Sequence, residues 1–206
     1  MNKARNEFAA PLGSATAGRL EFARGAGNVS IRAGASTDDL YHARFEGTAP
    51  DVRVEDGAVT VDYPRSWFLP DWGRHSADIV LNEAVPWSLE VRGGAARIYA
   101  DLSGLRLDFF KIDGGVSDVE LTLPEPSGTV SVHIVGGASS VRVRRPEGVA
   151  ACLRVVGGAS NLALDAQRLG AVGGDTALES GDYAGTTDRY EITVTGGAND
   201  LSVLYG

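Results

Sequence analysis

Apolar residues spaced by two recur on both sides of paired glycines along most of the chain. Gly-Gly pairs stand at 93/94, 114/115, 136/137, 157/158 and 196/197, and the first four are separated by 21, 22 and 21 residues. Apolar residues lie four and two positions before the first glycine of each pair, and four and six positions after the second. Spacing by two is the period of a β-strand whose alternate side chains face one interior. We therefore predict two short strands per copy, joined at a glycine corner.

The repeat predicts twenty interior positions. They are Leu89, Val91, Ile98, Ala100, Phe110, Ile112, Val119, Leu121, Val132, Ile134, Val141, Val143, Leu153, Val155, Leu162, Leu164, Ile192, Val194, Leu201 and Val203. At the corners, glycine supplies backbone conformations that other residues adopt at a cost. We expect Gly137 to be one such position, where an added side chain would clash.

A fixed period of about 21 residues is typical of a β-solenoid, in which each coil stacks on the one before it. In the alternative, a β-sandwich, each Gly-Gly pair would be the turn of a hairpin. The 39 residues from Gly157 to Gly196 are close to two periods, so we expect a degenerate coil with a phase slip there. The prediction is an all-β chain with a single solenoid domain over residues 18–206.

The N-terminal third carries a weaker copy of the repeat. Leu20 and Phe22 precede the glycines at 25 and 27, and Val29 and Ile31 follow them. Residues 55–57, Glu-Asp-Gly, are typical of a hairpin turn between two further strands. We expect residues 1–17 to be a partly flexible tail.

Composition and charge narrow the classes of partner. The 206 residues include 19 Lys and Arg against 27 Asp and Glu, a net charge of −8, which argues against broad electrostatic binding to nucleic acid or to an anionic membrane surface. No stretch of 18 apolar residues occurs and no secretion signal is recognisable at the N-terminus. The expectation is a cytoplasmic protein with no direct membrane insertion.

Residues able to do chemistry are present but not in catalytic patterns. The histidines, His42, His75 and His133, fall in three different coils without metal-ligand spacing, and no Gly-x-Ser-x-Gly motif is present. His133 alternates with apolar neighbours and should point outward. Cys152 lies in a strand pattern, typical of a small packed residue. The carboxylates that could serve a glycan-active site are in mixed registers; they are Asp101, Asp118, Glu120, Asp165 and Asp200. We predict no enzyme, no catalytic residue, no metal site and no cofactor.

A basic cluster is formed by Arg142, Arg144 and Arg145. Arg142 and Arg144 alternate with interior valines, so both should lie on one outward face. Such a patch would suit an anionic partner, or acidic residues on adjacent coils would neutralise it in rungs of ion pairs. The sequence allows both an anionic partner and neutralisation by ion pairs.

The segment 64–75 departs most from the repeat. It contains Trp67, Phe68 and Trp72 together with two prolines, which are excluded from the interior of a sheet. An aromatic loop here would either cap the open end of the solenoid core or serve as an anchor for a protein partner, since Trp is a favoured hot-spot residue.

The glycine corners with flanking alternation, preceded by Arg19-Leu20-Glu21-Phe22 and the run from Gly25 to Ile31, resemble the bacterial toastrack family, also called the putative-adhesin family. The chain looks related to the soluble domain of cell-wall stress-response membrane proteins. The resemblance implies a single-stranded, right-handed β-helix-like fold without catalytic residues. It also implies an assembly or sensing role in envelope-stress signalling.

The functional hypothesis that follows is a non-enzymatic protein-interaction or scaffold module in bacterial envelope-stress or regulatory signalling. Its partner would be an unidentified protein, such as a membrane or regulatory component, or a second copy of the chain. The alternative is a surface adhesin, or a glycan-binding or glycan-active β-helix protein. The candidate partner-binding residues are Trp67, Phe68, Trp72, Arg142 and Arg144.

Overall fold

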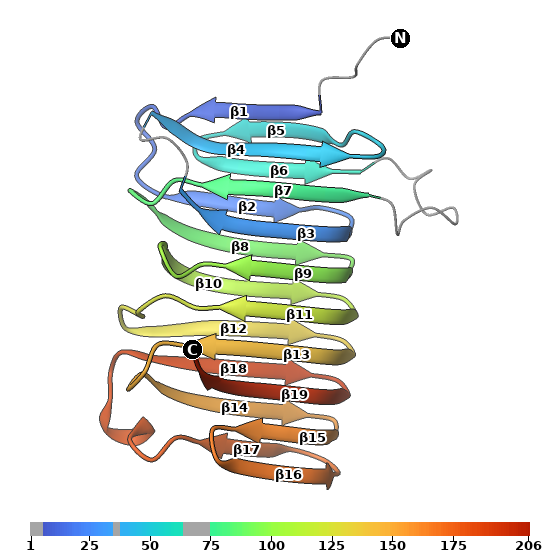
Figure 1. Ribbon diagram of the computed structural model, residues 1–206, viewed down its shortest axis with the longest axis vertical. Coiled ribbons are helices and arrows are strands. Elements are labelled where there is room, and N and C mark those ends of the chain that lie inside the picture. The colour runs from blue at the N-terminus through green and yellow to red at the C-terminus, as the bar shows by residue number, and fades with distance from the viewer. Residues whose placement is uncertain (1–5, 35–37, 64–74) are drawn as a thin grey trace.

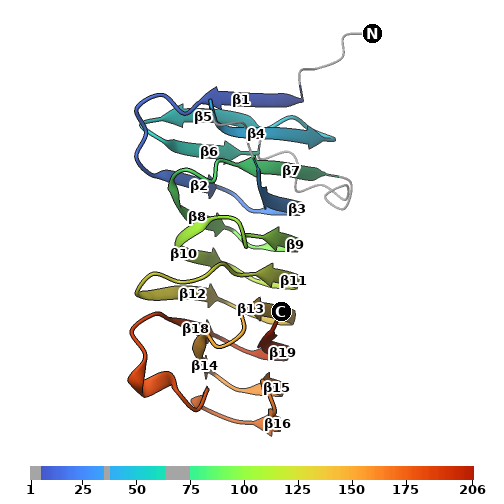
Figure 2. The same ribbon diagram turned by 60° about the vertical axis from the view of Figure 1, so that its left-hand side comes forward.

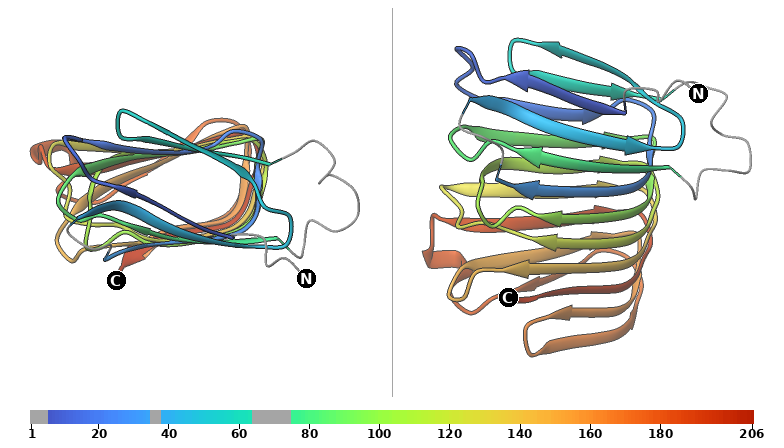
Figure 3. Two further views of the ribbon diagram at one scale, coloured as in Figure 1. Left: turned by 90° about the horizontal axis from the view of Figure 1, so that it is seen from above. Right: turned by 45° about the horizontal axis from the view of Figure 1, so that its top comes forward.

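The computed structural model describes residues 6–34, 38–63 and 75–206, and these residues form an all-β fold of two facing sheets (Figures 1 and 3). Among the described residues, the one helical element is a short 3-10 turn, η3 (Tyr183–Gly185). The view from above in Figure 3 shows the two sheets as separate layers around one interior.

The strand order within each sheet does not follow the chain. The ten-stranded sheet has the order β1 (Glu7–Pro11), β4 (Asp39–Glu46), β7 (Ser76–Leu81), β3 (Ala26–Ala33), β9 (Ala95–Asp101), β11 (Val116–Thr122), β13 (Ala138–Arg145), β19 (Ala198–Tyr205), β15 (Ala159–Leu164), β16 (Gln167–Val172). The nine-stranded sheet has the order β17 (Thr176–Glu179), β14 (Ala150–Val156), β18 (Arg189–Thr195), β12 (Thr129–Val135), β10 (Arg106–Asp113), β8 (Pro86–Arg92), β2 (Gly18–Phe22), β6 (Ala58–Asp62), β5 (Asp51–Glu55).

Six arches build the middle of the stack. In each arch a strand of the nine-stranded sheet leads through a glycine corner into a strand of the ten-stranded sheet; the arches are β2–β3, β8–β9, β10–β11, β12–β13, β14–β15 and β18–β19. The two strands of an arch lie in different sheets, so the glycine corners are not hairpin turns. Successive arches pair in parallel and in register, with Phe110 beside Val132 and Val119 beside Val141.

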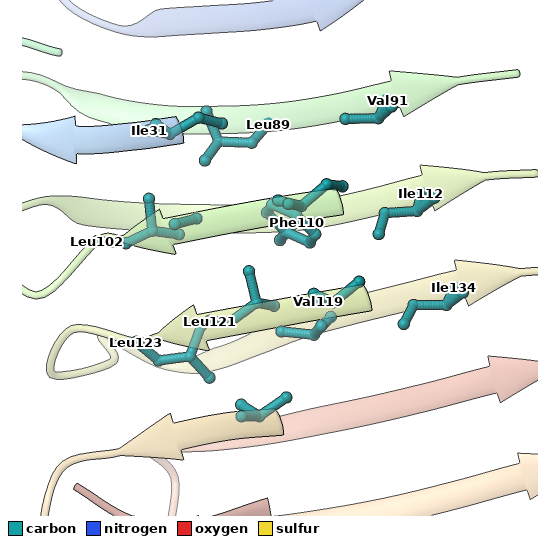
Figure 4. Packing of buried hydrophobic residues seen from close by; sticks show 14 of the residues in the cluster. Ile31, Leu89, Val91, Leu102, Phe110, Ile112, Val119, Leu121, Leu123 and Ile134 are labelled. Carbon is teal, nitrogen blue, oxygen red and sulfur yellow. The ribbon is translucent and has the colours of Figure 1, made fainter. Parts of the chain in front are cut away.

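The interior positions predicted from the repeat are confirmed. All twenty have at most 2% of their surface exposed, and they belong to one hydrophobic cluster between the sheets. Figure 4 shows how Phe110 and Ile112 from one sheet and Val119 and Leu121 from the other project into this shared interior. Spacing by two thus selects the inner face of every strand in the repeat.

The C-terminal arch is inserted between two arches that are consecutive in sequence. Strand β18 pairs with both β12 and β14, and β19 pairs with both β13 and β15. The prediction of a degenerate coil between Gly157 and Gly196 is therefore wrong. Residues of that stretch turn back as the antiparallel strands β16 and β17 at the end of the stack, and the chain then returns to insert its last arch (Figures 1 and 2).

An ion pair spans the inserted strand β19 and holds it in place. Arg145 at the end of β13 has no exposed side-chain surface and pairs with Asp165, which follows β15, at 2.5 Å. Its guanidinium also lies 3.9 Å from the ring centroid of Tyr205 on β19, and it donates to the backbone carbonyl of Val149. A buried charge needs such partners, so these contacts connect the inserted arch to both neighbours.

In the corner formed by Gly136 and Gly137, the first glycine is the constrained residue. Gly136 has φ +122°, and a Cβ there would lie 2.8 Å from the carbonyl group of Gly114 in the adjacent corner. Gly137 has no positive φ and nothing within 4 Å of a Cβ. The expectation that Gly137 is the constrained position is wrong, because in this corner the backbone of the adjacent arch approaches the first glycine.

The N-terminal part differs from the expected tail. Glu7–Pro11 form β1, which pairs antiparallel with β4 at the edge of the ten-stranded sheet. The hairpin turn at residues 55–57 is confirmed: β5 and β6 pair antiparallel, with positive φ at Asp56 and Gly57. No helix among the described residues is long and apolar enough to cross a membrane.

Candidate functional site

The outer face of the ten-stranded sheet carries exposed apolar and basic side chains on adjacent strands. Tyr99 on β9 is 50% exposed and Leu204 on β19 is 38% exposed. Between them lie Arg142 and Arg144 on β13, whose neighbours Val141 and Val143 face the interior. We call the surface formed by Tyr99, Glu120, Arg142, Arg144 and Leu204 the outer strip.

Two rungs of in-register residues build the outer strip. In the first, Tyr99, Glu120 and Arg142 lie side by side on β9, β11 and β13. In the second, Arg144 on β13 lies beside Leu204 on β19. Because the strands are held by ladders on both sides, the backbone positions of these side chains are fixed before any partner binds.

The two predicted arginines differ in their electrostatic surroundings. Arg142 donates from Nη1 to Oε1 of Glu120 at 3.0 Å, while 55% of its side chain stays exposed. The described residues include no ion-pair partner for Arg144, which is exposed. The hypothesis of neutralising rungs therefore holds for Arg142, and Arg144 keeps a net positive charge on the strip.

The third arginine of the sequence cluster is not part of this surface. Arg145 is buried, and it forms the ion pair with Asp165 that spans β19. Alternation alone assigns it to the inner side of β13, and its burial follows from its position beside Asp165 and Tyr205. The basic cluster thus divides into two surface arginines and one structural arginine.

The carboxylates considered for glycan chemistry each have a partner within the protein. The pairs are Asp101 with Ser103, Asp118 with Arg97, Glu120 with Arg142, Asp165 with Arg145, and Asp200 with Asn161 and Asn199. A general acid and base of a glycosidase must face a common cleft about 5–9 Å apart. Carboxylates engaged in separate contacts of this kind suit structural roles.

Two of the histidines, His133 and His75, and Cys152 are likewise held as structural residues. His133 lies on the outer face of β12 between buried neighbours, as predicted, with Nε2 at 3.3 Å from the Thr195 hydroxyl. His75 is buried and accepts a hydrogen bond from the Thr48 backbone N–H. Burial raises the pKa of the Cys152 thiol, which disfavours a reactive thiolate. No group of three or more potential metal ligands occurs among the described residues.

A shallow groove follows the stacked glycine corners. Its walls are small residues from four arches, including Ser117, Ser139, Ser160 and Asn199. Ser160 donates its hydroxyl proton to the Asn199 side-chain oxygen at 2.6 Å. The groove presents hydroxyl and amide groups but no charged side chain among its lining residues.

The aromatic candidates Trp67, Phe68 and Trp72 lie outside the described residues. Sequence reasoning missed Tyr99 and Leu204, although the repeat contains their signal. Ile98 and Ala100 face inward, so an aromatic residue between them must face outward. Leu204 follows interior Val203 in the same way.

The fold that carries this surface is similar to that of a solved structure. A search of curated proteins gives no match. A putative cell adhesion protein from Clostridium sporogenes ATCC 15579 has 18% sequence identity and a TM-score of 0.77, with 97% of this chain and 98% of that chain covered. A putative adhesin from Bacteroides fragilis NCTC 9343 has 10% identity and a TM-score of 0.36 over the same shares.

The family model described as the N-terminal domain of toast_rack, DUF2154, matches residues 2–144. The match covers the N-terminal strands and the arches up to β13, which contain the first three of the five copies of the predicted repeat. The chain therefore belongs to the toastrack family.

Proposed function

We propose that the chain is a non-enzymatic protein-interaction or scaffold module that binds its partner through the outer strip. The observation that carries the proposal is the exposure of Tyr99 and Leu204 on either side of the two surface arginines. Tyr and Arg are enriched among interface hot spots because they combine a large contact area with directional polar groups. A solenoid-like stack of arches presents them on a rigid, nearly flat face.

The chemistry of the outer strip defines the kind of partner. Arg144 offers an unneutralised positive charge beside Leu204, and Tyr99 offers an aromatic ring at the other side of the strip. A protein segment with an acidic side chain next to an apolar one complements this arrangement. The proposal includes a role in bacterial envelope-stress or regulatory signalling and a cytoplasmic location, with family membership as support for the first.

A second candidate function is glycan binding by a surface adhesin. The similar Clostridium sporogenes structure carries the name of a putative cell adhesion protein, and the half-exposed Tyr99 ring offers a stacking platform for a sugar. In that case Tyr99 would dominate recognition, and Arg144 would contribute little to a neutral glycan.

The test compares two double variants of the full chain. Each combines one truncation to Ala with one Arg→Glu charge reversal, and the two variants alter opposite sheets. Tyr99→Ala with Arg144→Glu changes the outer strip, and His133→Ala with Arg154→Glu changes the outer face of the nine-stranded sheet. All four side chains point outward, so both variants should retain the wild-type melting temperature. Each protein is immobilised, exposed to lysate of the native host, and the captured proteins are quantified by mass spectrometry.

We expect wild type and the nine-stranded-sheet variant to capture the same protein. The strip variant should bind it at least about 30-fold more weakly, the effect of losing a hot spot. Equal capture by the strip variant would refute the proposal. Binding to a glycan array that depends on Tyr99 but not on Arg144, without a captured protein, would establish the adhesin alternative.

A further inference from the structure

Each of the two sheets has two edge strands. Strands β1 and β5 lie at one end of the stack, and β16 and β17 lie at the other (Figure 1). An edge strand leaves backbone N–H and C=O groups unpaired, and proteins protect such edges with charges, proline or short length. The two ends of this molecule differ in that protection.

The end formed by β1 and β5 is protected. Strand β5 alternates Asp51, Arg53 and Glu55, so an antiparallel copy of itself in full overlap would place Arg53 opposite Arg53. Strand β1 begins with Glu7 and ends with Pro11, which has no backbone N–H to donate. Both features oppose the addition of another strand.

Strand β16 at the other end has neither a proline nor alternating charges. Arg168 is its single charged residue, and the chain from Leu169 to Gly174 is uncharged. Gly170 and Ala171 are exposed, and Leu169 and Val172 remain half-buried at the end of the core. The edge is therefore open to pairing, and its apolar side chains gain from being covered.

We propose that β16 pairs antiparallel with β16 of a second copy, which joins two molecules end to end as a two-fold dimer. In full overlap Leu169 lies opposite Gly170 and Arg168 lies opposite Ala171, so no two like charges meet. The two-fold axis runs perpendicular to the sheet, and closed two-fold pairing of this kind uses the same surface of both copies. The ten-stranded sheet would continue across the junction.

A second copy fits this end better than a single extended peptide. The Gln167 side chain donates from Nε2 to the backbone carbonyl of Glu179 at 2.8 Å, which ties β16 to β17 as one end face. Because the two sheets face each other, the axis that pairs β16 also makes the β17 edges of the two copies face each other across the junction. A peptide strand would extend one sheet and leave the other edge and the end of the core uncovered.

The test uses charges at a single position of the full chain. Directly opposite side chains in an antiparallel pair interact, so Ala171→Lys faces Arg168 of the other copy and Ala171→Glu faces the same residue with opposite sign. Light scattering after size exclusion and sedimentation velocity measure the mass against twice the chain mass of 21.5 kDa. Ala9→Lys on the exposed face of β1 serves as the control at the other end.

We expect wild type, Ala171→Glu and Ala9→Lys to dimerise, and Ala171→Lys to dimerise at least about tenfold more weakly because like charges meet. Arg168→Glu combined with Ala171→Lys should restore the dimer. A wild type that stays monomeric at about 100 μM, a concentration far above a micromolar Kd, would overturn the proposal. So would equal weakening by both Ala171 variants, dissociation by Ala9→Lys, or oligomers that grow with concentration, which indicate contact between unlike ends.

Discussion

Alanine at Gly136 and alanine at Gly137 should have very different effects, although the two residues are adjacent in the same corner. At Gly136 the backbone has φ +122°, a conformation that is essentially restricted to glycine. An added Cβ would also lie 2.8 Å from the carbonyl carbon and oxygen of Gly114 and 3.1 Å from the Gly115 nitrogen. These are backbone atoms, so no side-chain rotation relieves the contact.

The magnitude follows from two costs that add at this site. An L-residue in a disfavoured positive-φ conformation costs about 1–3 kcal/mol, and forcing extra atoms into a packed region costs about 1–3 kcal/mol more. Gly136→Ala should therefore lower the free energy of unfolding by about 2–6 kcal/mol. Gly137→Ala meets no atom within 4 Å and should change it by less than about 0.5 kcal/mol.

Urea unfolding followed by circular dichroism measures the difference. With a slope of about 2–3 kcal/mol per molar urea for a chain of this size, Gly136→Ala should shift the midpoint down by about 1–3 M. Gly137→Ala should unfold with the wild-type midpoint. Similar midpoints for the two variants, or a larger shift for Gly137→Ala, would refute the reasoning from stacked corners.

Three further predictions concern the core, the surface charges and the aromatic segment. Truncating a fully buried interior residue to Ala should lower the free energy of unfolding by about 2–4 kcal/mol, and near-neutral urea midpoints would mean that the inward register is wrong; the residues to test are Ile134, Val155 and Leu162. A hydrogen bond from Arg92, with further help from Arg19, holds the pKa of Glu90 below its usual value. This stabilisation is present above the unfolded pKa of about 4.3 and is lost as pH falls through the folded pKa, so Glu90→Gln should destabilise the protein at pH 7 and much less at pH 3; a pH-independent difference would contradict it. The double variant Trp67→Ala with Trp72→Ala should weaken association by at least about 2 kcal/mol with an intact β-rich spectrum if the segment binds a partner, whereas a lowered melting temperature with unchanged affinity would identify a cap.

The inward faces of the arches were predictable because burial imposes a strict period of two on each strand. The twenty interior positions needed no knowledge of strand order, since every arch places the same positions inward whichever neighbours it has. The same logic predicts outward His133 and Arg142. It does not predict how two adjacent glycines divide their roles, because the close approach at Gly136 involves the backbone of another arch.

Strand order could not be predicted because all arches carry the same signal. Each presents apolar positions at the same distances from its glycine corner, so an arch fits beside any other arch in register. The residues whose contacts depend on the inserted arch lie outside the repeat. Arg145, Asp165 and Tyr205 meet only when β19 lies between β13 and β15. In the sequence they appear as part of a basic cluster, an isolated acid and a terminal aromatic.

The inserted arch also has a consequence for folding. Strands β12 and β14 are separated in sequence by β13 alone, yet both complete their ladders on β18, which comes after β17. The arches β8–β9, β10–β11 and β12–β13 pair between sequence neighbours. Closure around the last arch needs contacts of greater sequence separation than these, which form more slowly. Until β19 is in place, Arg145 lacks the contacts that compensate a buried charge. The C-terminal arch therefore enters the stack between two arches that precede it in the sequence. The exposed β16 edge stays at the end of the stack, where a second molecule can reach it.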